Sequence, residues 1–207
     1  ADRNAVKISA VKGSGTLKIA QNVNIGKATK AALEGMAKVS PNLDIEIVET
    51  LGTVADSFGR RVKVNAKYDS GKIVIAADSD SPMLAAAKHE LTHHMKNINK
   101  NGYLAYRDFL INELLAKEGM RFEELMNEYS KMYTGLSREE LLDEIAADAS
   151  ELFFTDKAVI NKFAKKHHSL GQKVYDFIKK LVGATEKATT STRAAEMLDK
   201  HHDILNK

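Results

Sequence analysis

Cysteine and tryptophan are absent from this chain of 207 residues. Without cysteine there is no disulfide framework, no thiolate ligand for a zinc ion and no cysteine nucleophile. Aromatic residues make up only 6% of the sequence, so the core must depend on Leu, Ile, Val, Ala and Met. A metal site in this chain would therefore use histidine and carboxylate ligands.

The chain also lacks a large excess of charge of either sign and any long hydrophobic run. Its 31 basic and 28 acidic residues give a net charge of +3, which is too small to predict a nucleic-acid partner. No apolar stretch approaches the roughly 18 residues that predict a membrane span, so we expect a soluble protein. Its location is left open, as is whether the chain is a fragment of a larger protein.

The order of the sequence patterns predicts an α+β fold, in which a small, mainly antiparallel sheet precedes a larger helical part. Alternating apolar residues predict a strand at 43–49 and a hairpin over 62–76 that turns at 69–71. Apolar residues with helical spacing predict helices at 27–39, 82–98, 103–117, 120–133, 138–154, 157–167, 170–182 and 191–205.

Three regions are expected along the chain. Residues 1–40 form an N-terminal arm and helix, and residues 41–182 form the main domain. Residues 183–207 form a linker and a C-terminal helix. The linker is predicted from the stretch GATEKATTSTR, which separates two segments of helical periodicity.

The sequence HELTH at residues 89–93 is the strongest functional pattern in the chain. On a helix that begins near Pro82, His89 and His93 lie one turn apart, about 40° from each other around the axis. Apolar residues of the same segment, among them Leu91 and Met95, lie on the opposite side. Two imidazoles at this spacing are well placed to bind one zinc ion, which is the predicted cofactor.

Glu90 is the predicted general base. It is rotated about 100° from His89, so it does not easily ligate the same ion but can reach a water that the ion holds. Zinc lowers the pKa of such a water, and a neighbouring carboxylate can take its proton. The competing interpretation is a chance match to the pattern. Helical placement, with the histidines opposite the apolar face, argues against chance.

The segment at residues 139–154, EELLDEIAADASELFF, supplies candidates for a third ligand. On a helical wheel, Glu144 and Asp148 lie at the edge of the buried arc, whereas Glu140 and Glu151 point farther toward solvent. We therefore predict that Glu144 completes the metal site and that Asp148 accepts the outer N–H of a zinc histidine. The alternative is that both acids form a solvated border of the helix.

The other histidines are interpreted as structural or surface residues: His94, His167, His168, His201 and His202. One of His167 and His168 is a minor candidate to stabilise an oxyanion. Five tyrosines are also candidates for that hydrogen-bond donor, and the sequence does not choose among Tyr103, Tyr106, Tyr129, Tyr133 and Tyr175.

With HELTH at 89–93 and EIAAD at 144–148, the chain resembles the gluzincin group of zincin metallopeptidases, in which HExxH is followed downstream by a Glu in ExxxD. It looks most similar to the small metallopeptidase domains of phage and mobile-element proteins and of polymorphic toxins. The resemblance covers about residues 40–182. It implies a zincin-like fold with His89, His93 and Glu144 as ligands, Glu90 as the base and Asp148 behind a ligand.

We therefore expect a zinc-dependent endopeptidase that carries one zinc ion per chain and acts on a peptide or protein substrate. Two alternatives are a non-catalytic, zinc-stabilised binding or regulatory module and a toxin hydrolase that acts on another kind of substrate. Glu90 argues against the module, because a structural zinc site needs no base and closes with a fourth protein ligand. As in zincins, the strand from Lys72 to Ala77 is expected to lie at an edge beside the cleft and to pair with an extended peptide.

Overall fold

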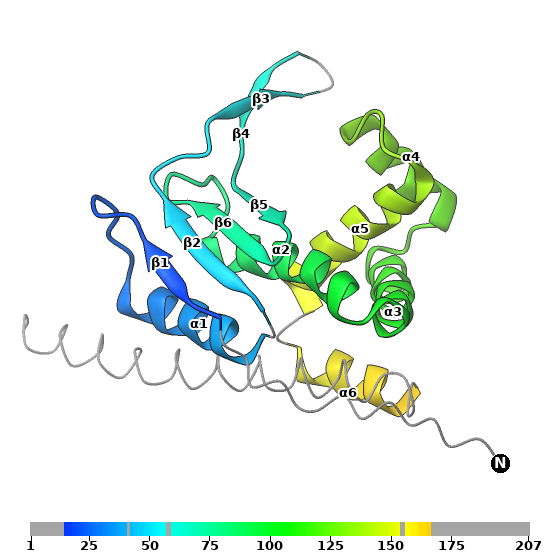
Figure 1. Cartoon of the computed structure of the whole chain (residues 1–207). Helices are drawn as coiled ribbons and strands as arrows, with labels where there is room; N and C mark the ends of the chain where they lie inside the picture. The colour runs from blue at the N-terminus through cyan, green and yellow to red at the C-terminus, as the bar shows by residue number, and fades with distance from the viewer. Residues whose placement is uncertain (1–14, 41, 57–58, 154–155, 167–207) are drawn as a thin grey trace, which may run out of the picture.

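The computed structural model describes residues 15–40, 42–56, 59–153 and 156–166, and within them a sheet precedes a set of helices (Figure 1). The predicted α+β class is confirmed. A four-stranded sheet has the order β1-β2-β6-β5. Its strands are β1 (Leu17–Ile19), β2 (Asp44–Val48), β5 (Ala66–Asp69) and β6 (Lys72–Ala76).

Strand directions in this sheet are mixed rather than mainly antiparallel. β1 pairs with β2 and β2 pairs with β6 in parallel, while β5 and β6 are antiparallel. The alternation of apolar and polar residues that predicted these strands indicates which face of a strand is buried. It does not indicate whether the neighbouring strand is parallel or antiparallel. Two of the three pairings instead follow from long connections, which return the chain to the same end of the sheet.

Helix α1 (Lys27–Val39) makes the first of these connections, between β1 and β2. Its Leu33 and Met36 are buried in the same core as Ile45 and Ile47 of β2. The described residues before and after residue 40 therefore share one core. Residues 183–207, where a linker and a helix were expected, lie outside the described residues.

The hairpin predicted over 62–76 turns where expected, but its first strand begins at Ala66 rather than at residue 62. Ser70 and Gly71 have φ values of 47° and 92°, which suits the two central positions of a tight turn between β5 and β6. Upstream, β4 (Arg61–Lys63) leaves the sheet and pairs with β3 (Thr53–Ala55) in a separate two-stranded sheet. This β3–β4 hairpin projects from the body of the protein (Figure 1).

The prediction that the strand from Lys72 to Ala77 is a free edge is wrong. β6 is paired on both sides, by β2 and by β5. The hairpin itself is the reason, because it folds β5 back along the outer side of β6. β5 is thus the edge strand of the sheet next to α2.

The helical part follows the sheet. Its helices are α2 (Met83–Ile98), α3 (Lys100–Glu118), α4 (Phe122–Met132), α5 (Arg138–Phe153) and α6 (Lys157–Lys166). These bounds agree closely with the predicted helices, while those expected at 170–182 and 191–205 lie outside the described residues. Among the described residues, no helix has the length and apolar character to cross a membrane.

α2 and α5 position the residues of interest, and their contact is tightly packed. Leu91 and Met95 of α2 are buried in the core, as the apolar stripe predicted. Next to this stripe, the buried Thr92 hydroxyl donates a hydrogen bond of 2.8 Å to the Ser150 hydroxyl of α5. Ile145 and Ala149 of α5 are completely buried. The two helices are therefore fixed in rotation with respect to each other.

Candidate metal centre

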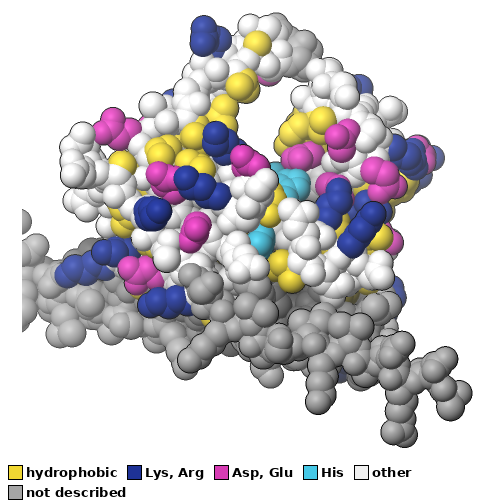
Figure 2. All heavy atoms as spheres, in the orientation of Figure 1, with side chains coloured by type: hydrophobic (Ala, Val, Ile, Leu, Met, Phe, Trp, Pro, Cys, Tyr) yellow, Lys and Arg dark blue, Asp and Glu magenta, His cyan; other side chains and the backbone are white. Residues whose placement is uncertain are grey.

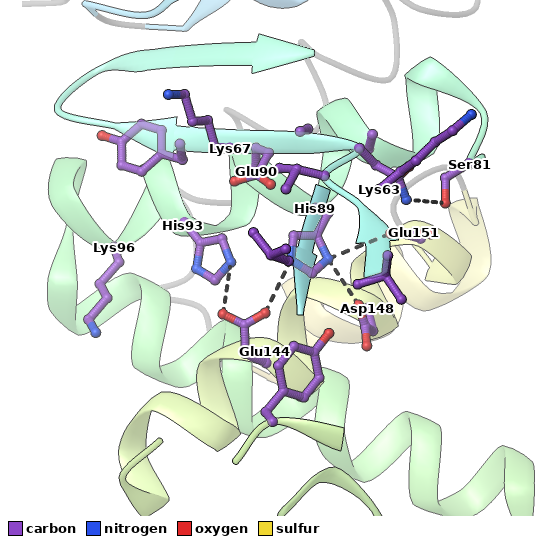
Figure 3. Close-up of a pocket in the computed structure, with 18 of the residues that line it drawn as sticks. Lys63, Lys67, Ser81, His89, Glu90, His93, Lys96, Glu144, Asp148 and Glu151 are labelled. Carbon is purple, nitrogen blue, oxygen red and sulfur yellow. Dashed lines mark hydrogen bonds and ion pairs between the residues drawn. The ribbon is translucent and has the colours of Figure 1, made fainter. Parts of the chain in front are cut away.

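Three donor side chains from α2 and α5 meet in this structure (Figure 3). His89 Nε2 lies 3.3 Å from Glu144 Oε2, and His93 Nε2 lies 3.5 Å from Glu144 Oε1. One donor atom from each residue lies within 4.8 Å of the other two. The side chains are 16%, 21% and 22% exposed, so they are held in place but remain accessible. The fold thus brings the three predicted ligands together.

Asp148 lies behind His89, on the side away from Glu144. His89 Nδ1 is 2.9 Å from Asp148 Oδ1. Asp148 Oδ2 in turn accepts a hydrogen bond of 2.8 Å from the Tyr129 hydroxyl on α4. This chain of contacts fixes the ring of His89, so that its Nδ1 faces a carboxylate and its Nε2 faces Glu144. The predicted position of Asp148 is the one observed.

The charges around His89 favour a cation. Burial alone would lower the pKa of His89, but hydrogen bonds to Asp148, Glu144 and Glu151 raise it to about 12. A bound metal ion would supply the positive charge that these carboxylates attract. Burial lowers the pKa of His93, which favours the neutral imidazole that ligates metals. Two imidazoles and one carboxylate form a donor set that fits zinc.

Glu90 lies beside these donors without joining them. It is 9% exposed, lines the same cavity and belongs to neither group of potential ligands among the described residues. Its carboxylate forms a hydrogen bond with the backbone of Tyr68 in β5. Burial raises the pKa of Glu90 to about 7, which the positive charge of His89 partly opposes. A carboxyl group with this pKa can both accept and release a proton near neutral pH.

The prediction that Glu151 points toward solvent is wrong. Its Oε1 lies 3.5 Å from His89 Nδ1, and it forms a second potential metal-binding group with His89 and Asp148. The spacing of Glu144, Asp148 and Glu151, four and then three residues, places all three on one face of a helix. That spacing was readable in the sequence. Glu140 is exposed, as expected, and caps α5 through Ser137.

Two tyrosines line the cavity of the candidate centre, Tyr68 and Tyr133. The hydroxyl of Tyr68 is 3.0 Å from His94 Nδ1 and accepts a hydrogen bond from Asn97. Tyr133 stacks on Tyr129 with ring centroids 5.9 Å apart. Burial raises the pKa of Tyr133, so its hydroxyl keeps its proton at neutral pH. Tyr68, which the sequence did not single out, enters the site only because β5 lies beside α2.

Three of the other tyrosines considered as oxyanion donors are engaged elsewhere. The Tyr103 hydroxyl donates to Asp143, and Tyr106 is buried against Phe163. Tyr129 donates to Asp148. His94 is 3% exposed, in agreement with a structural role. The candidates His167, His168 and Tyr175 lie outside the described residues, as do His201 and His202, which were interpreted as surface or structural residues.

The cavity over the centre has a volume of about 880 Å³ and two distinct walls. One wall is formed by the β3–β4 hairpin and β5, with Lys63 and Lys67 among its side chains. The other is formed by α2 and α5 and carries the histidines and acids. Figure 2 shows this hollow between the hairpin and the helices, with histidine side chains at its base. The centre is therefore open to a large ligand.

Comparisons with protein-family models, curated proteins and solved structures returned no match for this chain. The interpretation of the site therefore depends on its own geometry and chemistry.

Proposed function

We propose that the protein is a zinc-dependent endopeptidase. The observation that carries the proposal is the convergence of His89, His93 and Glu144 beside Glu90, which lines the same cavity but lies outside the donor set. Three protein donors leave a coordination position for water or substrate, as catalytic zinc sites do. A purely structural zinc site would close with a fourth protein ligand, and the described residues offer three donors around each candidate ion.

His89, His93 and Glu144 would hold the ion. When bound, Zn²⁺ would polarise the scissile carbonyl and lower the pKa of the attacking water. Glu90 removes a proton from that water as its oxygen bonds to the carbonyl carbon. As the C–N bond breaks, Glu90 returns the proton to the leaving amine. The burial that raises the pKa of Glu90 suits it to both steps.

Tyr133 is the tyrosine of the cavity best suited to donate a hydrogen bond to the developing oxyanion. It lines the cavity together with Glu90 and Glu144, and its hydroxyl stays protonated. Tyr68 is less suited, because its hydroxyl already contacts His94 and Asn97. A single donor of this kind is typically worth about 10²–10³-fold in rate.

The edge of β5 is the proposed place for the substrate backbone. Ala76 donates a hydrogen bond to Asn65, so the next residue along, Ala66, turns its backbone groups away from β6. Tyr68 turns the same way, and its backbone contacts Glu90. An extended peptide that pairs with this edge would lie directly over Glu90 and the donor set.

The test is a cleavage scan with zinc-loaded protein and a library of peptides from a proteome digest. New peptide termini are identified by mass spectrometry. Wild type should generate them, while Glu90→Gln and chelator-treated wild type should not. A library left intact by zinc-loaded wild type would refute the endopeptidase and favour a binding module or a hydrolase of another substrate.

A further inference from the structure

An apolar stripe runs along the strand wall of the cavity. It consists of Val54 in β3, Val62 in β4, Val64, and Ala66 in β5, and all four residues line the cavity. Val54 and Val62 are opposite each other in the hairpin and are 53% and 40% exposed. Val62, Val64 and Ala66 alternate in sequence and so share one face of an extended chain.

This stripe has a pattern typical of a buried face, but of its four residues only Ala66 packs against the core of the described residues, while Val54 and Val62 are exposed. Alternating apolar residues predict a strand packed on a core. Here Val54, Val62 and Val64 stand outside the hydrophobic core that the described residues form. All three line the cavity over the candidate metal centre instead, together with Lys63 and Asn65. An apolar surface gathered in a cavity indicates a ligand that covers it.

Several hydrogen bonds hold the stripe in a fixed position relative to α2. The Val64 N–H donates to the Gly52 carbonyl oxygen over 3.0 Å, and Lys63 Nζ donates to the Asp78 carbonyl oxygen over 3.0 Å. Asn65 Nδ2 donates to the hydroxyl of Ser81, just before α2, over 3.2 Å. The base of the hairpin is thereby tied to the start of the helix that carries His89.

The charged side chains on this wall indicate which ligands would bind there. Lys63 and Lys67 line the strand wall, whereas Glu144 and Asp148 lie on the helix wall (Figure 3). Lys67 is exposed, whereas Lys63 forms ion pairs with Asp80 at 3.3 Å and with Asp78 at 3.9 Å, so Lys67 contributes more of the positive charge. A ligand segment that follows the strand wall therefore meets apolar surface flanked by positive charge. This surface is complementary to a peptide in which an apolar residue is flanked by acidic or uncharged residues. Basic residues next to the apolar one would be repelled by the lysines.

We propose that the apolar stripe determines substrate specificity: it selects peptides that place an apolar side chain against Val54 and Val62, with acidic or uncharged residues beside it. This inference rests on the proposed endopeptidase function. The substrate backbone pairs with β5, and the stripe extends from β5 along the hairpin. One substrate side chain near the scissile bond is thus directed onto the valine pair.

The first test compares cleavage specificities in the same peptide library. Wild type should cleave bonds with Leu, Ile, Val, Met or Phe enriched at one fixed position near the bond, and Lys and Arg depleted beside it. Val54→Thr/Val62→Thr, which keeps the shape of both side chains, should lose that enrichment while still cleaving. Ile98→Thr is the matched control, because Ile98 is 43% exposed and lies outside the cavity.

The second test measures binding without turnover. A cleaved peptide and its copies with Asp or Lys in place of the apolar residue are titrated into zinc-loaded Glu90→Gln protein. The apolar peptide should bind about tenfold more tightly than either copy, the difference expected for an apolar subsite. Adding the two Thr substitutions should remove that difference.

The outcomes separate this inference from the proposed function. Cleavage by wild type without an apolar preference, or with a preference that survives the double Thr substitution, would overturn the inference and leave the endopeptidase intact. Absence of cleavage by wild type would overturn the endopeptidase and the inference together.

Discussion

Glu90 differs from its neighbours in the candidate centre because it lies next to the donor side chains without being one of them. The proposed base, Glu90, directly follows the proposed ligand His89 in the chain, and helical geometry explains why their side chains point in different directions. His89 and His93 share a face, whereas Glu90 is turned about 100° away, toward β5. The contact with the Tyr68 backbone holds its carboxylate in that direction.

Replacement of Glu90 should therefore separate metal binding from catalysis. Glu90→Gln keeps the shape of the side chain but cannot act as a base. We expect the variant to bind zinc like wild type and to lose about 10²–10⁴-fold in kcat/KM. Zinc titration and steady-state kinetics on one cleaved peptide measure the two effects. Near-normal turnover by Glu90→Gln would show that Glu90 is not the general base.

Asp148 is predicted to act on the metal through His89. Asp148→Asn should leave the zinc stoichiometry unchanged but weaken affinity or activity by about 10–100-fold, because the amide no longer fixes the imidazole. Tyr129→Phe, which removes only the hydrogen bond behind Asp148, should have a smaller effect in the same direction. Competition with a fluorescent zinc chelator gives both affinities. Unchanged affinity and activity in Asp148→Asn would contradict this role.

At the scale of elements, α5 offers several acids along its length and presents only some of them to the centre. Glu144, Asp148 and Glu151 face α2, while Glu140 caps the helix at Ser137. The buried contact between Thr92 and Ser150 fixes this rotation. The packing of α5 against α2 therefore decides, together with residue type, which acid could bind a metal ion.

Glu144→Ala and Glu140→Ala form a matched pair that tests this selection. Both remove one carboxylate from the same helix. Glu144→Ala should weaken zinc binding by at least about 10-fold, because two imidazoles remain as protein ligands. Glu140→Ala should leave affinity unchanged and slightly lower the stability of the helix through the lost cap. Equal zinc affinities of the two variants would contradict the assignment of Glu144.

Sequence patterns predicted the helices well and singled out three side chains that the fold brings together, because both depend on short-range spacing. The positions of His89, Glu90 and His93 on α2 follow from the periodicity of one segment. The edge strand could not be found in this way. β6 reads as an apolar strand whether one or both of its sides are paired, and only the long-range pairing of β2, β6 and β5 decides the matter.

The β3–β4 hairpin was missed for a related reason. Val62 and Val64 belong to an alternating pattern that is usual in a core strand, so the sequence predicted one continuous strand up to the turn. In the structure this face lines a cavity instead. Sequence patterns identify an apolar face but do not say whether protein or ligand covers it.

At the scale of the whole molecule, a buried ionic network joins three helices close to the centre. Asp143 of α5 is 5% exposed and accepts hydrogen bonds from Tyr103 and Arg107 of α3 and from Lys96 of α2. Asp143 precedes Glu144 directly in the chain. The network therefore helps to hold α5 against α2 at the level of the metal donors.

Removal of Asp143 should destabilise the fold even without metal. Asp143→Ala leaves the buried Tyr103 hydroxyl without its acceptor and removes one of the carboxylates around Arg107, which keeps its contact with Glu139 at 2.7 Å. We expect a loss of roughly 1–3 kcal/mol in the free energy of unfolding. Asp108→Ala is the control, since Asp108 contacts the same arginine from a 67% exposed position. Urea unfolding of both variants in the presence of chelator measures the difference. Equal stabilities would contradict the importance of the network.

The central claim is a single zinc centre formed by His89, His93 and Glu144. Native mass spectrometry of protein purified without chelators, compared with His89→Ala and with the control His94→Ala, tests it most directly. We predict one zinc ion per chain in wild type and in His94→Ala, and none in His89→Ala. Wild-type protein that stays metal-free in the presence of stoichiometric zinc, or His89→Ala that retains the ion, would contradict the account.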